Sequence, residues 1–188
     1  LVGTLRTDII TPRMFQYRIL EKAKEVRKLI VLPEGTEPRI LKAAEEIQHR
    51  RVCDVVILGD KDVIIGLLKR DGISIDESCI LDYRRDNAAT LEEYGRTLYE
   101  LRKHKGITLE HARDSVLDPI VYSAMMVYKG DADGYVSGST HSTADTLRPV
   151  LQLIRTKPDV LLASSVFFMC MPEQVIVPEL VVPDHPPT

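Results

Sequence analysis

The sequence has few cysteines and no long uninterrupted apolar run, and both features narrow the class of protein. Cys53, Cys79 and Cys170 are odd in number and widely spaced, so they form neither a disulfide framework nor a metal-binding pattern. The longest apolar stretch, residues 160–171, contains two serines and is shorter than the ~20 residues of a membrane-spanning helix. The first ten residues lack the basic and apolar regions of a signal peptide. We therefore expect a cytoplasmic protein in a reducing compartment, without membrane association.

The net charge argues against general nucleic-acid binding. Hydrophobic residues make up 44% and charged residues 28% of the 188 residues, which is ordinary for a globular protein, and the formal net charge is -3. A protein of this charge does not attract nucleic acid in general, so an anionic ligand must be held by a local cluster of Arg, Lys and backbone N–H groups. The sequence also lacks a phosphate-binding Walker loop, a dinucleotide fingerprint and zinc-ligand spacing. We expect no metal and no redox cofactor.

Short apolar runs alternate with amphipathic stretches along the chain. The pattern predicts strands at residues 28–32, 52–58, 79–81, 133–136 and 161–169. It predicts helices that begin at Pro12, Pro38 and about residue 63, followed by 88–105, 108–116, a helix from Pro119, and one that begins within 137–143 and runs through 154. Thr11 and Thr108 are the expected caps of two of these helices. The runs are nearly all apolar, as in strands that helices cover on both faces. The pattern therefore predicts an α/β fold, in which a parallel sheet with right-handed crossovers forms the middle of three layers.

The segment after the strand at 133–136 is the best candidate for a binding site. Small and hydroxyl residues from Ser137 to Thr146 lead into a helix, where backbone N–H groups and the positive helix end favour an anion. Arg148 could add a bidentate contact. The alternative is a polar turn with Arg148 in a structural salt bridge, and the residues alone leave both open. His141 could contact a substrate or cap the turn, and we favour the cap.

Two further segments have a structural and a functional interpretation. Residues 102–105, Arg-Lys-His-Lys, end a long helix just before Gly106, where cations complement the helix dipole. The helix position of Arg102, taken alone, favours this structural role. The loop at residues 33–37 follows a strand end, where α/β proteins place ligands, but it could equally be a connecting turn.

Five segments in this order resemble the phosphate acetyltransferase family. They are 30–35 (IVLPEG), 101–108 (LRKHKGIT), 133–149 (DGYVSGSTHSTADTLRP), 151–156 (LQLIRT) and 164–174 (SSVFFMCMPEQ), and together they cover roughly residues 10–177. The resemblance implies reversible acetyl transfer between acetyl-CoA and phosphate, giving acetyl phosphate and CoA, with CoA as a substrate. It also implies a two-domain homodimer with the architecture of isocitrate and isopropylmalate dehydrogenases and a cleft between the domains.

The resemblance also assigns residues. It places Arg102 and Arg148 at the active site as catalytic residues, which reverses the structural interpretation of Arg102. It makes the following loop and helix residues substrate-binding: Ser137, Gly138, Ser139, Thr140, His141, Thr143 and Thr146. We expect residues 1–10 to be a linker from an upstream region, 11–145 to be the first α/β domain, and 146–188 to be the truncated start of a second, incomplete one.

The family's base, an aspartate preceded by a Ser-Arg pair, has no counterpart in these residues. We therefore expect this polypeptide alone to be inactive. One alternative is a non-catalytic acetyl-CoA-sensing module of a larger enzyme. Another is a phosphate butyryltransferase, since the acyl pocket cannot be read from these residues. A dehydrogenase of the related fold is a third, but no nicotinamide-binding pattern supports it.

Overall fold

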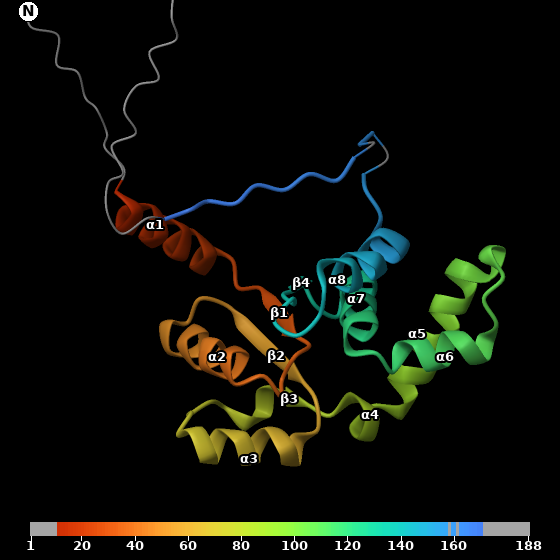
Figure 1. Ribbon diagram of the computed structural model, residues 1–188, viewed down its shortest axis with the longest axis horizontal. Coiled ribbons are helices and arrows are strands. Elements are labelled where there is room, and N and C mark those ends of the chain that lie inside the picture. Colours follow the sequence, from red (N-terminus) through yellow and green to blue (C-terminus); the bar gives the residue numbers. More distant parts are fainter. Residues whose placement is uncertain (1–10, 158, 161, 171–188) are drawn as a thin grey trace, which may run out of the picture.

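The computed structural model describes residues 11–157, 159–160 and 162–170 (Figure 1). The strands are β1 (Leu29–Leu32), β2 (Asp54–Leu58), β3 (Ile80–Leu81) and β4 (Gly134–Tyr135). The helices are α1 (Pro12–Glu25), α2 (Pro38–Arg50), α3 (Lys61–Asp71), α4 (Tyr83–Asp86), α5 (Ala88–Arg102), α6 (Leu109–Val116), α7 (Pro119–Lys129) and α8 (Thr143–Pro149). Short 3₁₀ turns η1 (Glu77–Cys79) and η2 (Lys103–Lys105) precede β3 and follow α5, and a π-helical segment η3 (Val150–Ile154) extends α8.

The strands form one parallel sheet in the order β3-β2-β1-β4. Leu29 pairs with Asp54 at the start of the β1–β2 ladder, and Ile30 pairs with Gly134 on the other side of β1. Helices lie between consecutive strands, as crossover connections of parallel strands require. The predicted α/β fold with a parallel sheet is confirmed.

Alternate side chains of the central strands enter two separate cores. Val31 and Leu58 belong to one core, which they share with residues of α5, α6 and α7. Leu32 and Ile57 point the other way and pack with α2 and α3. This period of two is what a strand produces when both faces are covered. The sheet is thus the middle of three layers, and Figure 1 shows α2 and α3 on one side of it with α7 and α8 on the other.

The helix starts follow the capping residues of the sequence. Thr11 and Thr108 accept hydrogen bonds from the backbone nitrogens of Met14 and His111, both at 3.2 Å, so both predicted caps are confirmed. The long helix α5 ends at Arg102 rather than at Lys105. The last three residues tighten into a 3₁₀ turn, which Gly106 closes in the left-handed region with a φ of 82°.

The predicted strand at residues 161–169 is wrong for the part of it that the structure describes, residues 162–169. These residues belong to no sheet, and Figure 1 shows them as part of a drawn-out segment. Their apolar side chains are exposed, with Phe167 at 90%. The one aromatic contact recorded for them joins Phe168 to Phe15 of α1, at 5.3 Å between ring centroids. An extended segment becomes a strand only when a neighbouring strand accepts its backbone hydrogen bonds, and the described residues supply none.

Two helices differ from the sequence pattern. The apolar stripe of α1 is present, but no residue of this helix is buried. The single-turn helix α4 was not predicted, and its Tyr83 is buried in the core beside α7. No helix in the described ranges combines the length and apolar character needed to cross a membrane.

Candidate active site

The loops that follow β1 and β4 leave the sheet side by side. From β1, the chain crosses to β2 on one side, whereas β4 joins on the other side. The carboxyl ends of β1 and β4 therefore flank the point where the strand order reverses, which is where open α/β sheets bind ligands. Residues 33–37 and 136–142 form the two loops at this point.

The side chain of Glu34, in the loop after β1, holds the loop after β4 in place. Its side chain is 1% exposed. One carboxylate oxygen accepts hydrogen bonds from the amides of Gly138 (3.1 Å) and Ser139 (2.9 Å). The other accepts from the amides of Thr140 (2.7 Å) and His141 (3.0 Å), from the Thr140 hydroxyl (2.9 Å) and from His141 Nδ1 (2.8 Å). Gly138 adopts a φ of 116°, which a side chain would disfavour.

These contacts keep Glu34 ionised. Burial raises the pKa of its carboxyl, but the hydrogen bonds from His141, Thr140 and Ser139 together outweigh burial and lower the pKa from 4.5 to about 2. The N–H groups that the sequence offered to a phosphate therefore face an internal carboxylate. Sequence reasoning noted Glu34 only as part of a loop at a strand end. The usable signal was an acidic residue between Pro33 and Gly35 where the strand pattern ends.

The sequence favoured a cap of the turn for His141, and the structure places its ring against Glu34. The cap of α8 is Ser142, whose hydroxyl accepts from the Asp145 amide at 3.2 Å. The His141 ring turns instead toward Glu34, because a buried carboxylate attracts the nearest side-chain donor.

The other hydroxyl residues of the predicted site differ in what they contact. The Thr146 hydroxyl donates within the helix to the carbonyl oxygen of Ser142 at 3.1 Å. The carbonyl oxygen of Ser139 accepts from Arg39 Nη2 at 3.3 Å. The side-chain oxygen of Ser137 is buried and has no hydrogen-bond partner in the described part of the chain. Thr143 is exposed on the first turn of α8.

Arg102 opens into a cavity of about 380 Å³ between α5, α6, α7 and η3. Its lining residues are Leu98, Arg102, Lys105, Gly106, Ile107, His111, Ser115, Val121, Pro149, Gln152 and Leu153. The lining holds two cationic side chains and a histidine but no carboxylate. Within the described ranges, Arg102 and Lys105 have no ion-pair partner recorded. Such a cavity suits a negatively charged ligand.

Arg148 does not line this cavity. It is exposed on α8, and its neighbour Pro149 is the residue that reaches the cavity. Arg148 contributes to the lowered pKa of Asp145, although the main cause is a hydrogen bond from Ser142. The structure thus brings Arg102 to a basic cavity and does not bring Arg148 into its lining.

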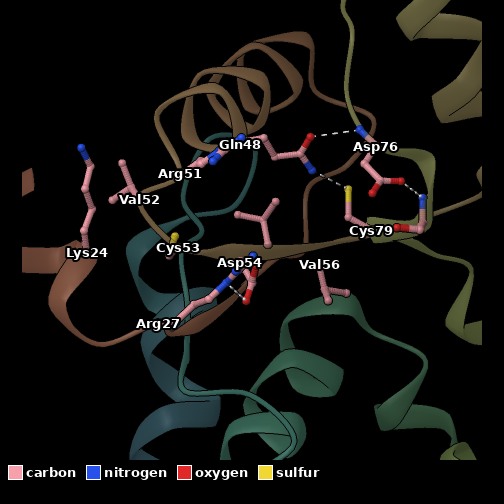
Figure 2. A pocket seen from close by; sticks show the side chains of 12 residues that line it. Lys24, Arg27, Gln48, Arg51, Val52, Cys53, Asp54, Val56, Asp76 and Cys79 are labelled. Carbon is pink, nitrogen blue, oxygen red and sulfur yellow. Dashed lines mark hydrogen bonds and ion pairs between the residues drawn. The ribbon is translucent and has the colours of Figure 1, made fainter.

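Two of the larger cavities have carboxylates in their linings and are less suited to anions. One, of about 720 Å³, lies at the amino end of β2. Arg27 binds Asp54 there at 2.6 and 2.7 Å. Figure 2 shows this pair, and it shows Gln48 between Asp76 and Cys79. The other, of about 610 Å³, adjoins the Glu34 loop. Its arginines are already engaged: Arg84 with a carbonyl oxygen, and Arg85 with the carboxylates of Asp60, Asp62 and Asp82.

Comparisons with known proteins agree on one family. The family model described as "Phosphate acetyl/butaryl transferase" matches residues 14–181. The phosphate acetyltransferase of Nitratidesulfovibrio vulgaris is 45% identical over 172 residues, which are 92% of this chain and 24% of that protein. That of Acetivibrio thermocellus is 45% identical over 161 residues, which are 84% of this chain and 46% of that protein.

Solved structures give the same result. A crystal structure of a phosphotransacetylase from Streptococcus pyogenes matches with a TM-score of 0.71 and 34% identity, over 78% of this chain and 44% of that one. A Staphylococcus aureus phosphotransacetylase matches with a TM-score of 0.70 and 33% identity, over 79% and 44%. The chain spans between about a quarter and a half of the lengths of these relatives. The chain belongs to the phosphate acetyl/butaryl transferase family.

Proposed function

We propose that the protein containing this chain is a phosphate acetyltransferase, which moves an acetyl group reversibly between CoA and phosphate. This proposal rests on the family match over residues 14–181. It is supported by a basic cavity around Arg102 that has no carboxylate in its lining. Both acetyl phosphate and CoA bring negative charge, and a cavity of this kind lowers the energy of such ligands.

The chemistry assigns a task to each arginine. In the direction of acetyl-CoA synthesis, the CoA sulfur attacks the carbonyl carbon of acetyl phosphate as a thiolate and forms a carbon–sulfur bond. The bond from that carbon to the phosphate oxygen breaks, inorganic phosphate leaves, and the thiol proton ends on the phosphate. Arg102 holds one anionic substrate from within the cavity. Arg148, on α8, stabilises negative charge on the phosphate as it leaves. A guanidinium suits this task because it can donate two parallel hydrogen bonds to a phosphate.

The loop residues are assigned to the substrate by their side chains. Since the amides of residues 138–141 donate to Glu34, contacts to acetyl phosphate or CoA fall to the hydroxyls of Ser139 and Thr143 and to the outer nitrogen of His141. The Ser137 hydroxyl joins them once the loop moves to expose its buried oxygen. Thr140 and Thr146 shape the loop and the first turns of α8 around these groups. Neither a metal nor a redox cofactor is needed for this reaction, so CoA is a substrate only.

The remaining assignments extend the same proposal. Residues 11–145 form the first α/β domain and a second begins at residue 146, in a homodimer built like isocitrate and isopropylmalate dehydrogenases that acts in the cytoplasm. Two other functions remain as outcomes of the test. A butyryltransferase would prefer the longer acyl group, and a sensing module would bind acetyl-CoA without turnover.

The test is thioester formation from acetyl phosphate and CoA by the product of the complete reading frame. We expect Arg102→Ala and Arg148→Ala each to lower kcat/KM about 30-fold, or ~2 kcal/mol, when a bidentate contact is lost. Arg50→Ala is the control, because Arg50 is an exposed residue of α2 that, among the described residues, pairs with Glu46 of the same helix alone. Full activity in both active-site variants would remove these arginines from the site, and absence of turnover in the unaltered protein would overturn the function.

A further inference from the structure

We propose that Glu34 is a positioning residue, an internal anion that holds loop 137–141 in the shape that the reaction uses. The part of this inference that concerns the reaction rests on the proposed function. The part that concerns the loop does not, because the hydrogen bonds belong to the chain itself.

The geometry of the loop is that of an anion site already filled. Consecutive backbone N–H groups that converge on one point form a nest, and proteins use such nests to bind phosphate. Here the amides of residues 138–141 converge on the carboxylate of Glu34. With the Thr140 hydroxyl and His141 Nδ1, the carboxylate takes part in six hydrogen bonds. A carboxylate offers about four lone-pair sites, so its capacity is used up.

The charge of Glu34 is compensated mainly by the loop. In the described part of the chain, its one recorded ion-pair partner is His141, and no Arg or Lys lies within ion-pair distance. The amide dipoles and the imidazole therefore stabilise the carboxylate. It follows that loop 137–141 and Glu34 depend on each other: without the carboxylate, four part-buried amide hydrogen bonds lose their acceptor.

Glu34 also orients His141. Because Nδ1 lies 2.8 Å from the carboxylate, Nδ1 carries a proton toward Glu34, and Nε2 is the nitrogen left for another partner. The Glu34 backbone is itself held firmly, since the amide of the next residue, Gly35, donates to the carbonyl oxygen of Leu58 in β2. Through Glu34, the sheet thereby holds the loop and the imidazole of His141 in place.

A consequence concerns the substrate. The phosphate of acetyl phosphate cannot use the amides of residues 138–141 unless it displaces Glu34. The nest is thus closed to phosphate, and the arginines are left to bind it. Positioned groups of this kind speed a reaction by fixing geometry before the substrate arrives.

Hydrogen exchange read by mass spectrometry tests the loop directly in the product of the complete reading frame. In Glu34→Ala, we expect the amides of residues 138–141 to exchange at least about tenfold faster than in the unaltered protein. Glu46→Ala is the matched control, because Glu46 is an exposed residue of α2, and it leaves this exchange unchanged. Equal protection in Glu34→Ala and the unaltered protein would overturn the inference.

Chemical rescue separates an internal anion from a general structural role. Formate is a small carboxylate, and added to Glu34→Ala it should fill the vacated nest and slow the exchange of the same amides, whereas chloride at equal ionic strength should not. If formate has no effect, Glu34 does not act as an anion in a nest. Should Glu34→Ala fail to fold, Thr140→Val removes one hydroxyl donor and should speed exchange in the loop by a smaller factor; unchanged exchange in that variant would overturn the inference.

The catalytic part is read from kinetics. We expect Glu34→Ala to lower kcat by at least about tenfold, with a smaller change in KM, and formate to restore part of kcat. An unchanged kcat would show that the loop is ordered by Glu34 but that the reaction does not depend on it, and the proposed role would fall. If the unaltered protein has no acyltransferase activity, the proposed function fails while the exchange experiment still decides the role of Glu34 in the loop.

Discussion

The phenol of Tyr135, on the edge strand β4, donates a hydrogen bond to the carbonyl oxygen of Thr146 in α8, and the two oxygens are 2.7 Å apart. Burial, followed by the charge of Asp118, raises the pKa of Tyr135 to about 12. The hydroxyl therefore keeps its proton and its role as a donor throughout the neutral range. This bond ties the helix that carries Arg148 to the sheet.

We expect Tyr135→Phe to lower the free energy of unfolding by ~1 kcal/mol, the usual net contribution of one such bond. Acyl transfer should fall as well, because α8 loses its tether beside Arg148. Urea unfolding and steady-state kinetics measure the two effects. Tyr128→Phe is the control, since Tyr128 is 41% exposed on α7 and no hydrogen bond of its hydroxyl is recorded within the described residues. Equal stability losses in the two variants would show that the Tyr135 bond contributes nothing specific.

Gly35 has no room for a side chain. A Cβ atom there would lie 2.5 Å from the carbonyl oxygen of Leu58 and 2.6 Å from a side-chain carbon of Ile57. Gly35→Ala must push the loop away from β2 and move Glu34 with it, so we expect a loss of ~2 kcal/mol or more. Gly66→Ala is the matched control. Nothing lies within 4 Å of a Cβ at that position of α3, and alanine there should stabilise the helix by ~0.5–1 kcal/mol. Chemical unfolding of the two variants decides, and a stable Gly35→Ala protein would contradict the packing described for this loop.

The lowered pKa of Glu34 gives a pH dependence with a definite sign. The folded carboxyl titrates near 2 and the unfolded one near its ordinary value of 4.5. The stabilisation is complete above pH 4.5 and is lost as the pH falls toward 2, with a ceiling of roughly 3 kcal/mol. We expect the stability difference between the unaltered protein and Glu34→Gln to be largest at neutral pH and to shrink between pH 4.5 and 3. Carboxylates such as Asp54 titrate in both proteins and cancel in the difference. A difference that stays constant with pH would contradict this account.

The local part of the fold follows from the sequence, because short-range physics decides it. Apolar runs predicted β1 and β2, and Thr11 and Thr108 predicted helix starts, since a cap depends on residues three positions away. The prediction of a strand at 161–169 was wrong, for the described residues, for a related reason. An apolar, extended segment has the same composition with or without a partner strand, and only the fold decides whether that partner is present.

The candidate site depends on contacts that the sequence does not reveal. Glu34 meets its loop across more than 100 residues, so no spacing rule could pair them. The side chain of His141 can form a cap or donate a hydrogen bond to a carboxylate. Its ring contacts Glu34 because the fold places that buried carboxylate beside it. From its position before Gly106, Arg102 had the features of a cation that ends an ordinary helix. The cavity beside it exists only because α6 and η3 pack against α5.

The final prediction compares two lysines of the same 3₁₀ turn. Lys105 lines the cavity of Arg102, whereas Lys103 is not part of the lining and pairs with Glu100 on the surface. If the cavity receives an anionic substrate, Lys105→Met should raise KM for CoA or acetyl phosphate about fivefold, while Lys103→Met leaves both KM values unchanged. The two substitutions remove the same charge from positions two residues apart, so a general effect of net charge would act on both alike. Because the interaction is electrostatic, the difference between the variants should diminish as salt is added. Equal KM values in the two variants at low salt would mean that the substrate does not bind in this cavity.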